Sequence, residues 1–178
     1  MNPIAEPMPA RDSKLEELIL FVVEKDERCG AAKLDKILFY ADFRAYDKLG
    51  RSITGRRYRK LAGGPVPEGL ATVVEDMERR RLCAREDQRL VALREPDLSF
   101  LAPEEIEITR AVVRELWPLN AAEVSDRSHR FPGWQAAEIG EEIPYSTVFV
   151  DEPRPLTPEE VAWAQEVMGD FLGRQQTA

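Results

Sequence analysis

The sequence predicts a mainly α-helical fold, a compact helical domain of about six helices with a small β-hairpin and short extended segments. Apolar residues recur at helical spacing over several long stretches. Glycine or proline stands where those stretches begin or end, as is typical of helix boundaries. The 178 residues, 43% of them hydrophobic, make up one ordinary domain with enough apolar residues for a core.

The first helix is expected after a flexible N-terminal arm, residues 1–12, which holds three prolines and no periodic pattern. Ser13 is placed to cap this helix, and Glu16 three residues later would complete a capping box. The residues of its apolar face share one-face helical spacing: Leu15, Leu18, Ile19, Val22 and Val23.

A second helix is predicted from about Ala31 to Leu49, between Gly30 and Gly50. Glycine is the usual residue just past a helix C-terminus, because it adopts the left-handed conformation freely. Apolar residues form two adjacent stripes on this helix: Leu34, Ile37, Leu38, Ala41 and Ala45, then Phe39, Phe43 and Tyr46. A helix that is apolar over so much of its circumference is expected at the centre of the domain.

The middle of the chain changes character. Residues 53–61 are typical of an extended segment, and residues 63–67 of a turn. Pro67 is expected in the first turn of a third helix, where its missing N–H costs nothing. The predicted buried face of that helix is Leu70, Val73, Val74 and Met77. A hairpin is then predicted from Leu82 to Leu93, turning at residues 86–88.

The later helices are predicted from their boundary residues. Pro103 begins a fourth helix, which must end before Pro118. Asn120 and Glu123 can cap a fifth helix that runs to about Ser128. Residues 131–134 interrupt it, and a short strand-like stretch follows at residues 145–150.

Thr157 begins a C-terminal helix, and its apolar face is Val161, Ala164, Met168 and Phe171. No internal repeat or long linker divides the chain. We therefore expect one helical domain at residues 13–150, with residues 151–178 forming a C-terminal helix packed on the same domain.

Charge is spread unevenly around a formal net value of -8. By count, residues 51–94 carry 11 basic and 6 acidic side chains, whereas residues 95–178 carry 6 and 17. The acidic half disfavours nucleic acid as a partner, since phosphate contacts require clustered lysine and arginine. The basic middle could meet an acidic partner, or the two halves could neutralise each other within the fold.

The cellular compartment is predicted from two kinds of observation. No apolar run reaches the roughly 20 residues of a membrane-spanning helix, and the N-terminus lacks the pattern of a signal peptide. Cys29 and Cys83 are too few for a disulfide scaffold, which fits a reducing compartment. We therefore expect a cytoplasmic protein with no membrane partner.

His129 is the only histidine, and Ser125, Asp126 and Ser128 stand close before it. A hydrolase would need a serine and this histidine to meet as nucleophile and base, but near-adjacent helical side chains diverge. Ser125 and His129 are four residues apart and could touch, yet no nucleophile elbow accompanies them. We expect a capped helix end here, no catalytic residue, and a protein that is not an enzyme.

No cofactor or metal site is predicted. One histidine and two distant cysteines cannot form an ordinary zinc site. Residues 63–65, Gly-Gly-Pro, suggest a phosphate loop, but proline lacks the N–H donor and no Gly-Lys-Ser/Thr follows. Asp42 and Asp47, with Glu24 or Asp26, could bind a divalent cation or act as acid and base; we expect solvated surface carboxylates instead.

Basic residues are concentrated in what we call the basic belt: Arg51, Arg56, Arg57, Arg59, Lys60, Arg79, Arg80, Arg81, Arg85 and Arg89. Helix, turn, helix and hairpin in this order could also describe a winged-helix transcription regulator that binds DNA. The third helix, however, carries Glu75, Asp76 and Glu78, which DNA phosphates would repel. A solvated face or a protein-docking face is therefore the favoured interpretation of the belt.

Several of these segments occur together in an order typical of one family. Residues 33–43, Lys-Leu-Asp-Lys-Ile-Leu-Phe-Tyr-Ala-Asp-Phe, are followed by Gly50–Gly55, Tyr58–Leu61 and Gly64–Pro67, and later by Val124–His129 and Pro132–Trp134. From about residue 13 to 150, the chain resembles the Panacea domain family, the SocA-like or phage-associated antitoxin proteins. The combination is more specific than any single segment.

The resemblance implies a mainly helical antitoxin that neutralises a cognate toxin, encoded nearby, by direct protein–protein binding and without catalysis. Some SocA-like members are adaptors that present the toxin to an ATP-dependent protease, so this role is also implied. Two features depart from the family pattern or add to it: the extra Gly63 and the acidic tail after about residue 151. The tail helix is either the part specific for the toxin or a lid on the core.

Candidate site residues follow from the same comparison. Partner binding is assigned to residues of the basic belt and the proline turn: Arg56, Arg57, Tyr58, Lys60, Pro65 and Pro67. The remaining motif residues are expected to preserve the fold: Lys33, Leu34, Leu38, Tyr40, Ser125, Asp126, His129 and Trp134. Trp134 in particular is expected to bury against the central helix.

Overall fold

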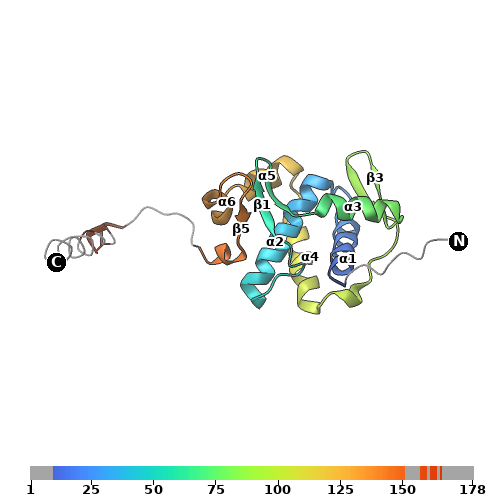
Figure 1. Cartoon of the computed structure of the whole chain (residues 1–178), viewed down its shortest axis with the longest axis horizontal. Coiled ribbons are helices and arrows are strands. Elements are labelled where there is room, and N and C mark those ends of the chain that lie inside the picture. The colour runs from blue at the N-terminus through green and yellow to red at the C-terminus, as the bar shows by residue number, and fades with distance from the viewer. Residues whose placement is uncertain (1–9, 151–156, 160, 164, 166–178) are drawn as a thin grey trace.

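The computed structural model describes residues 10–150, 157–159, 161–163 and 165. Within these ranges the fold is mainly helical, as predicted, with helices α1 to α6, a partly described helical segment near the C-terminus and two small antiparallel sheets (Figure 1). The helices are α1 (Ala10–Lys25), α2 (Ala31–Leu49), α3 (Leu70–Arg79), α4 (Pro103–Leu116), α5 (Ala121–Ser128) and α6 (Pro132–Ala136). Short 3-10 helices lie at η1 (Leu98–Phe100) and η2 (Tyr145–Phe149).

The strands form two separate antiparallel sheets. One sheet has the order β2 (Gly64–Pro67), β1 (Tyr58–Leu61), β5 (Glu142–Ile143). The other is the predicted hairpin of β3 (Cys83–Glu86) and β4 (Arg89–Ala92), which turns at Asp87 and Gln88. The hairpin is therefore confirmed, whereas the three-stranded sheet is an addition to the prediction.

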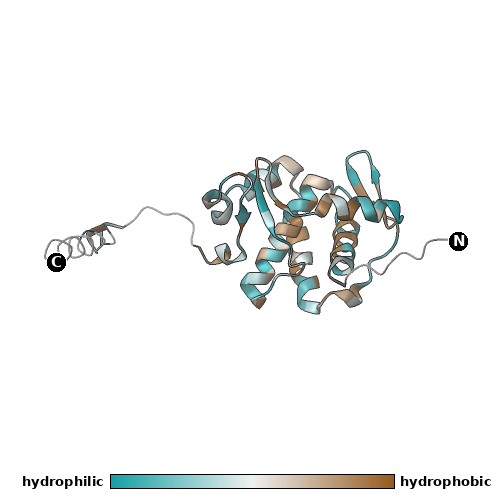
Figure 2. Ribbon diagram, in the orientation of Figure 1, coloured by the Kyte–Doolittle hydropathy of each residue, from teal (hydrophilic) through white to brown (hydrophobic). Residues whose placement is uncertain are grey.

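Helix α2 is the central element that its two apolar stripes predict. It runs through the middle of the molecule and packs against α1, α4, α5, β2 and η2 (Figure 1). Hydrophobic residues concentrate on the facing sides of α1, α2 and α4 (Figure 2). Gly50 ends the helix in the left-handed conformation, with a φ of 70°, and its N–H donates to the Tyr46 carbonyl. This boundary is confirmed.

The predicted starting residues of helices α4 and α5 are also confirmed. Helix α4 begins at Pro103. At the start of α5, the Asn120 side chain accepts a hydrogen bond from the Glu123 N–H at 3.0 Å, and the Glu123 carboxylate accepts one from the Asn120 N–H at 2.8 Å. This is the capping box that the sequence predicts.

Three local predictions are wrong. Helix α1 begins at Ala10, so Ser13 lies within the helix and does not cap it. Pro67 pairs with Tyr58 in β2, and Gly69 stands at the N-cap of α3. Residues 145–149 form a 3-10 helix, because the Pro144 carbonyl accepts hydrogen bonds from both the N–H and the hydroxyl of Thr147.

The predicted C-terminal helix is described only in part. Residues 158, 159, 161–163 and 165 are helical, and the side chains of Val161 and Trp163 are exposed. The remainder of residues 151–178, and with it the predicted packing on the domain, lies outside the described residues. The predicted arm is described from Ala10 onward, where it is already helical. Within the described ranges, every helix is too short or too polar to span a bilayer.

Candidate partner-binding groove

Half of the predicted partner-binding residues lie inside the molecule. The Tyr58 side chain is 1% exposed, and its hydroxyl donates to an Asp42 carboxylate oxygen at 2.7 Å. Pro65 and Pro67 are buried in β2, which packs against α2. These three residues are removed from the predicted binding surface, because the hairpin of β1 and β2 faces the core and turns only its outer side chains to solvent.

Arg56, Arg57 and Lys60 do reach the surface, but they are held by neighbours in the same chain. Arg57 forms an ion pair with Glu68 at 3.0 Å, and the Arg56 guanidinium donates to the Glu68 carbonyl at 3.4 Å. Lys60 donates to the Ala137 carbonyl at 2.8 Å and lies 4.1 Å from the centroid of the Trp134 ring. These contacts support a structural role for this part of the basic belt, Arg56, Arg57 and Lys60.

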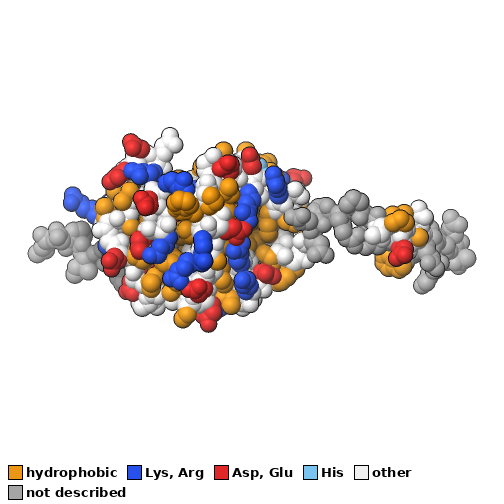
Figure 3. Space-filling view, turned by 180° about the vertical axis from the view of Figure 1, so that it is seen from behind, with side chains coloured by type: hydrophobic (Ala, Val, Ile, Leu, Met, Phe, Trp, Pro, Cys, Tyr) orange, Lys and Arg blue, Asp and Glu red, His pale blue; other side chains and the backbone are white. Residues whose placement is uncertain are grey.

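Most of the basic belt is paired in the same way. Its arginines contact carboxylates of the same chain: Arg51 with Glu105, Arg59 with Glu68, Arg79 and Arg80 with Asp76, Arg80 also with Glu16, Arg85 with Glu78, and Arg89 with Glu86. On the face opposite that of Figure 1, lysine and arginine side chains are interspersed with acidic ones (Figure 3). This pairing weighs against the winged-helix interpretation, since these arginines already have counterions.

Asp42 is the centre of a closed polar cluster and not a solvated surface carboxylate, so that prediction is wrong. Its carboxylate accepts hydrogen bonds from the Ile53 and Thr54 N–H groups, both at 2.8 Å, and from the hydroxyls of Thr54 and Tyr58. Burial raises the pKa of the Asp42 carboxyl, and these hydrogen bonds oppose the rise. The cluster fixes residues 53–58 against α2, with the Asp42 side chain fully buried.

The histidine motif is organised around an aromatic stack. The His129 ring lies parallel to the Trp134 ring, with centroids 4.1 Å apart and an interplanar angle of 17°. The Ser128 hydroxyl donates to the Ser125 carbonyl at 2.7 Å instead of to the imidazole, while Asp126 is exposed. Trp134 packs against the aromatic cluster that includes Phe39 of α2, as predicted.

The motif residues of α2 hold the start of this helix in the core. Leu34 and Leu38 are buried in the main hydrophobic cluster, and Tyr40 packs edge-to-face on Phe39 at 5.3 Å. Lys33 is also buried, and its ammonium contacts the Asp26 carboxylate at 2.6 Å. Removing either partner would leave an uncompensated polar group in the core.

Gly64 explains why the Gly-Pro-Val-Pro segment begins with glycine. Its φ is 108°, which other residues rarely adopt, and an added Cβ would lie 2.6 Å from Ser128 Oγ and 2.7 Å from Lys36 Cε. The strand β2 therefore lies directly against α2 and α5 at this point. Three motif segments far apart in the sequence meet here.

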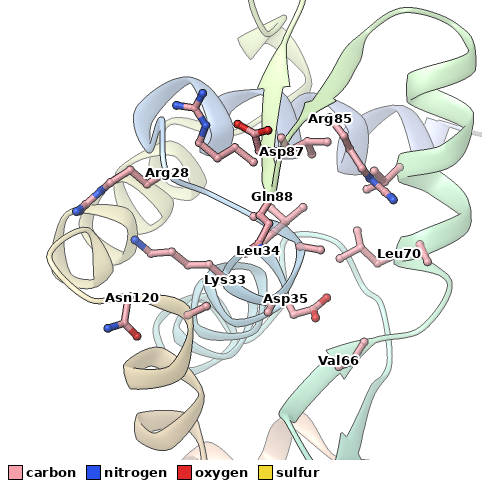
Figure 4. A pocket seen from close by; sticks show the side chains of 18 of the residues that line it. Arg28, Lys33, Leu34, Asp35, Val66, Leu70, Arg85, Asp87, Gln88 and Asn120 are labelled. Atoms are coloured by element: carbon pink, nitrogen blue, oxygen red, sulfur yellow. The ribbon is translucent and has the colours of Figure 1, made fainter.

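A groove opens beside this contact, at the N-terminal end of α2. It has a volume of about 760 Å³ and is walled by α2, β2, α3, the β3–β4 hairpin and the start of α5 (Figure 4). Its apolar lining comes from several elements: Ala31, Leu34, Val66, Leu70, Ala71, Val74, Leu90, Leu119 and Ala121. The size and apolar character are typical of a site that binds a partner segment or ligand.

Two tight contacts fix the hairpin wall of the groove. The Leu90 N–H donates to the Cys29 carbonyl at 2.8 Å. Gly30, the N-cap of α2, lies so close to the hairpin that an added Cβ would be 2.3 Å from the Gln88 carbonyl oxygen. The groove is therefore a preformed feature of the fold.

Four basic and two acidic side chains line the groove, and three of the basic ones are paired within the chain, Lys33 with Asp26, Arg85 with Glu78 and Arg89 with Glu86. Arg28 and Lys33 lie on the side of α5, and Arg85 lies on the side of α3 (Figure 4). Asp35 also lines the groove, with its carboxylate 3.8 Å from the ammonium of the buried Lys36. Burial raises the pKa of Asp35 to about 6 and lowers that of Lys36.

Arg28 and Trp117 form an exposed pair at the rim. The guanidinium lies 4.3 Å from the centroid of the Trp117 ring, which is 49% exposed, and donates to the Trp117 carbonyl. Tryptophan and arginine are enriched among residues that dominate binding energies at protein interfaces. Sequence reasoning missed this pair, although Trp117 directly before Pro118 signals a large apolar residue at a helix end.

The comparisons with known proteins bear on residues 34–135. Over this range, more than half of the chain, the sequence matches the family model described as antitoxin SocA-like, Panacea domain. The match spans α2 to α6, and so covers the aromatic stack and most of the groove. No curated protein and no solved structure matches the chain.

Proposed function

The chain belongs to the SocA-like antitoxin family with a Panacea domain, which supports an antitoxin-type function, and we propose that it neutralises a cognate toxin by binding it directly. In this proposal the toxin is encoded nearby, and the chain contributes a binding surface and no catalytic group. The proposal combines the family membership with one structural observation, the preformed apolar groove at the start of α2.

The groove is the proposed toxin-binding surface. Its apolar floor would bury side chains of the toxin, and the exposed Arg28–Trp117 pair would extend the contact at the rim. The predicted surface around Arg56, Arg57 and Lys60 lies on the three-stranded sheet, where neighbours in the chain hold these side chains. We therefore place binding at the groove and not at that surface.

Two neighbouring positions on α3 give a matched test. Ala71 lines the groove, whereas Thr72 is exposed but does not line it. With the toxin encoded beside this gene, we expect Ala71→Glu to weaken binding about tenfold or more in a titration, because it places a charge on the apolar floor. Thr72→Glu should bind like the wild type, and both variants should unfold at similar temperatures.

Co-expression provides the functional readout. The wild type and Thr72→Glu should restore growth to cells that produce the toxin, while Ala71→Glu should restore it poorly. Full rescue by Ala71→Glu, with unchanged affinity, would move the binding surface away from the groove. Absence of any complex between the two wild-type proteins would contradict direct neutralisation itself.

An adaptor role is the finer part of the proposal. If the antitoxin only covers the toxin, the amount of toxin in the cell should stay constant or rise when both are produced. If it presents the toxin to an ATP-dependent protease, the toxin should disappear faster with the antitoxin than without it. Measuring toxin lifetime after synthesis is stopped, in cells with and without the protease, separates the two modes.

A further inference from the structure

We propose that the toxin segment bound in the groove is apolar and carries one lysine or arginine, whose positive charge contacts the Asp35 carboxylate. This inference rests on the groove being the toxin-binding surface. It names the occupant by its chemistry and makes Asp35 the residue that selects it.

The basic side chains that line the groove already have partners in the same chain. Three of them form ion pairs: Lys33 with Asp26, Arg85 with Glu78, and Arg89 with Glu86. The fourth, Arg28, donates to the Trp117 carbonyl and lies over the Trp117 ring. An acidic segment would have to compete with these contacts, so the basic side chains do not select the occupant.

Asp35 is the charged group of the groove with the least compensation. Among the residues that the structure describes, its one ion pair is with Lys36 at 3.8 Å, which is too long for a hydrogen bond. The Asp35 side chain is only 18% exposed, so water replaces little of the missing contact. Burial raises the pKa of this carboxyl to about 6 although Lys36 opposes the rise. The lost hydration is therefore not made good within the chain.

The other charges of the groove differ from Asp35 in their exposure. The Arg89–Glu86 pair has the same separation of 3.8 Å, but its side chains are 47% and 59% exposed, so water solvates both. Asp87, the second acidic residue of the lining, is also exposed. Only at Asp35 does a charge combine low hydration with a loose ion pair.

The surroundings of Asp35 suit a long basic side chain. The carboxylate points from α2 toward Val66 of β2 and Leu70 of α3, which belong to the apolar lining (Figure 4). Lysine and arginine can lay their methylene groups on such a surface while the charged end reaches a carboxylate. Attraction between the two charges is stronger here than in water, because the apolar walls lower the local dielectric constant.

Asp35 would thereby discriminate between toxin segments. A purely apolar segment that covers the groove removes the remaining water from the carboxylate and offers nothing in return, which costs binding energy. An acidic segment adds repulsion to this cost. A segment with one lysine or arginine beside Asp35 recovers the lost hydration through an ion pair. The apolar lining thus supplies affinity, and Asp35 supplies specificity.

The first measurement compares two full-length variants that each lose one negative charge from α2. Asp35 lines the groove, whereas Asp47 is an exposed residue of the same helix outside the groove. In a titration with the toxin encoded beside this gene, we expect Asp35→Asn to weaken the complex about tenfold, because an ion pair in an apolar setting is lost. Asp47→Asn should bind like the wild type.

A double-mutant cycle then identifies the partner charge. Each lysine and arginine of the toxin is replaced in turn by methionine, and each variant is titrated against the wild type and against Asp35→Asn. For one toxin residue, the loss of affinity seen with the wild type should largely disappear with Asp35→Asn, which is the signature of a direct contact. Toxin residues that do not contact Asp35 should give the same loss with both proteins.

Two outcomes would overturn the inference. One is that Asp35→Asn binds the toxin as tightly as Asp47→Asn, or more tightly, which would assign a neutral or acidic segment to the groove. The other is that every toxin substitution gives the same loss with both proteins, which would leave Asp35 a structural role within the chain. The groove itself remains the binding surface in both cases if Ala71→Glu weakens the complex, so the two proposals fail separately.

Discussion

The two halves of helix α2 each carry an aspartate inside the fold, Asp42 fully buried and Asp35 half-buried, and the two are in opposite situations. Asp42 accepts hydrogen bonds from the backbone and hydroxyl groups of residues 53–58 and lies in a closed cluster. Asp35 lies at the edge of an open groove, where its ion pair with Lys36 spans 3.8 Å. A fully satisfied carboxylate stabilises the fold, whereas a weakly satisfied one beside an opening is available to a partner.

The largest expected effect on stability comes from removing the Asp42 carboxylate. Asp42→Ala leaves two N–H groups and two hydroxyls without their acceptor in the core. We expect a loss of about 3–5 kcal/mol in the free energy of unfolding, measured by urea denaturation. Asp47→Ala, at an exposed position of the same helix, should change it by less than about 0.5 kcal/mol. A small effect of Asp42→Ala would show that the cluster is not essential to the fold.

A second prediction concerns the contact of β2 with α2 and α5 at Gly64, beside the groove. Gly64→Ala forces a Cβ against Ser128 and Lys36 at a φ of 108°. We expect it to lower the free energy of unfolding by about 2–3 kcal/mol. The adjacent Gly63→Ala is the control, because nothing lies within 4 Å of its added Cβ. Equal melting temperatures for the two variants would contradict the close approach of β2 to α2.

The smallest predicted effect is the pH dependence of the free energy of unfolding that Asp35, beside the groove, causes. The pKa of Asp35 rises on folding from 3.8 to about 6, so the folded state keeps this proton to higher pH than the unfolded state. The stability that the protonated carboxyl contributes is complete below about pH 4 and lost as the pH rises through 6. Relative to Asp35→Asn, the wild type should therefore lose on the order of 1–2 kcal/mol between these values.

Denaturant unfolding at pH 4, 5, 6 and 7 measures this difference. Asp87→Asn, an exposed substitution in the same groove, serves as the control. Its pH profile should run parallel to that of the wild type. A parallel profile for Asp35→Asn as well would mean that Asp35 is solvated like a surface residue.

Features set by neighbouring residues could be predicted from the sequence. The Gly50 cap and the Asn120–Glu123 capping box depend on contacts within a few residues, and both are present. The basic neighbours of Tyr58 predict an exposed side chain, whereas its burial depends on β5, more than eighty residues later, and on Asp42. The groove could not be predicted either, since its walls come from segments between residues 28 and 121. No local pattern reports such distant contacts.

The placement of the three tryptophans has an optical consequence. Trp117 is exposed beside Arg28 at the groove, Trp163 is exposed on the C-terminal segment, and Trp134 is partly buried between His129 and Lys60. Indole emission depends on the polarity of its surroundings, so each ring reports on a different part of the molecule. Proteins that retain one tryptophan at a time would show the filling of the groove through Trp117. Trp134 would serve as an internal reference, and no added dye would be needed.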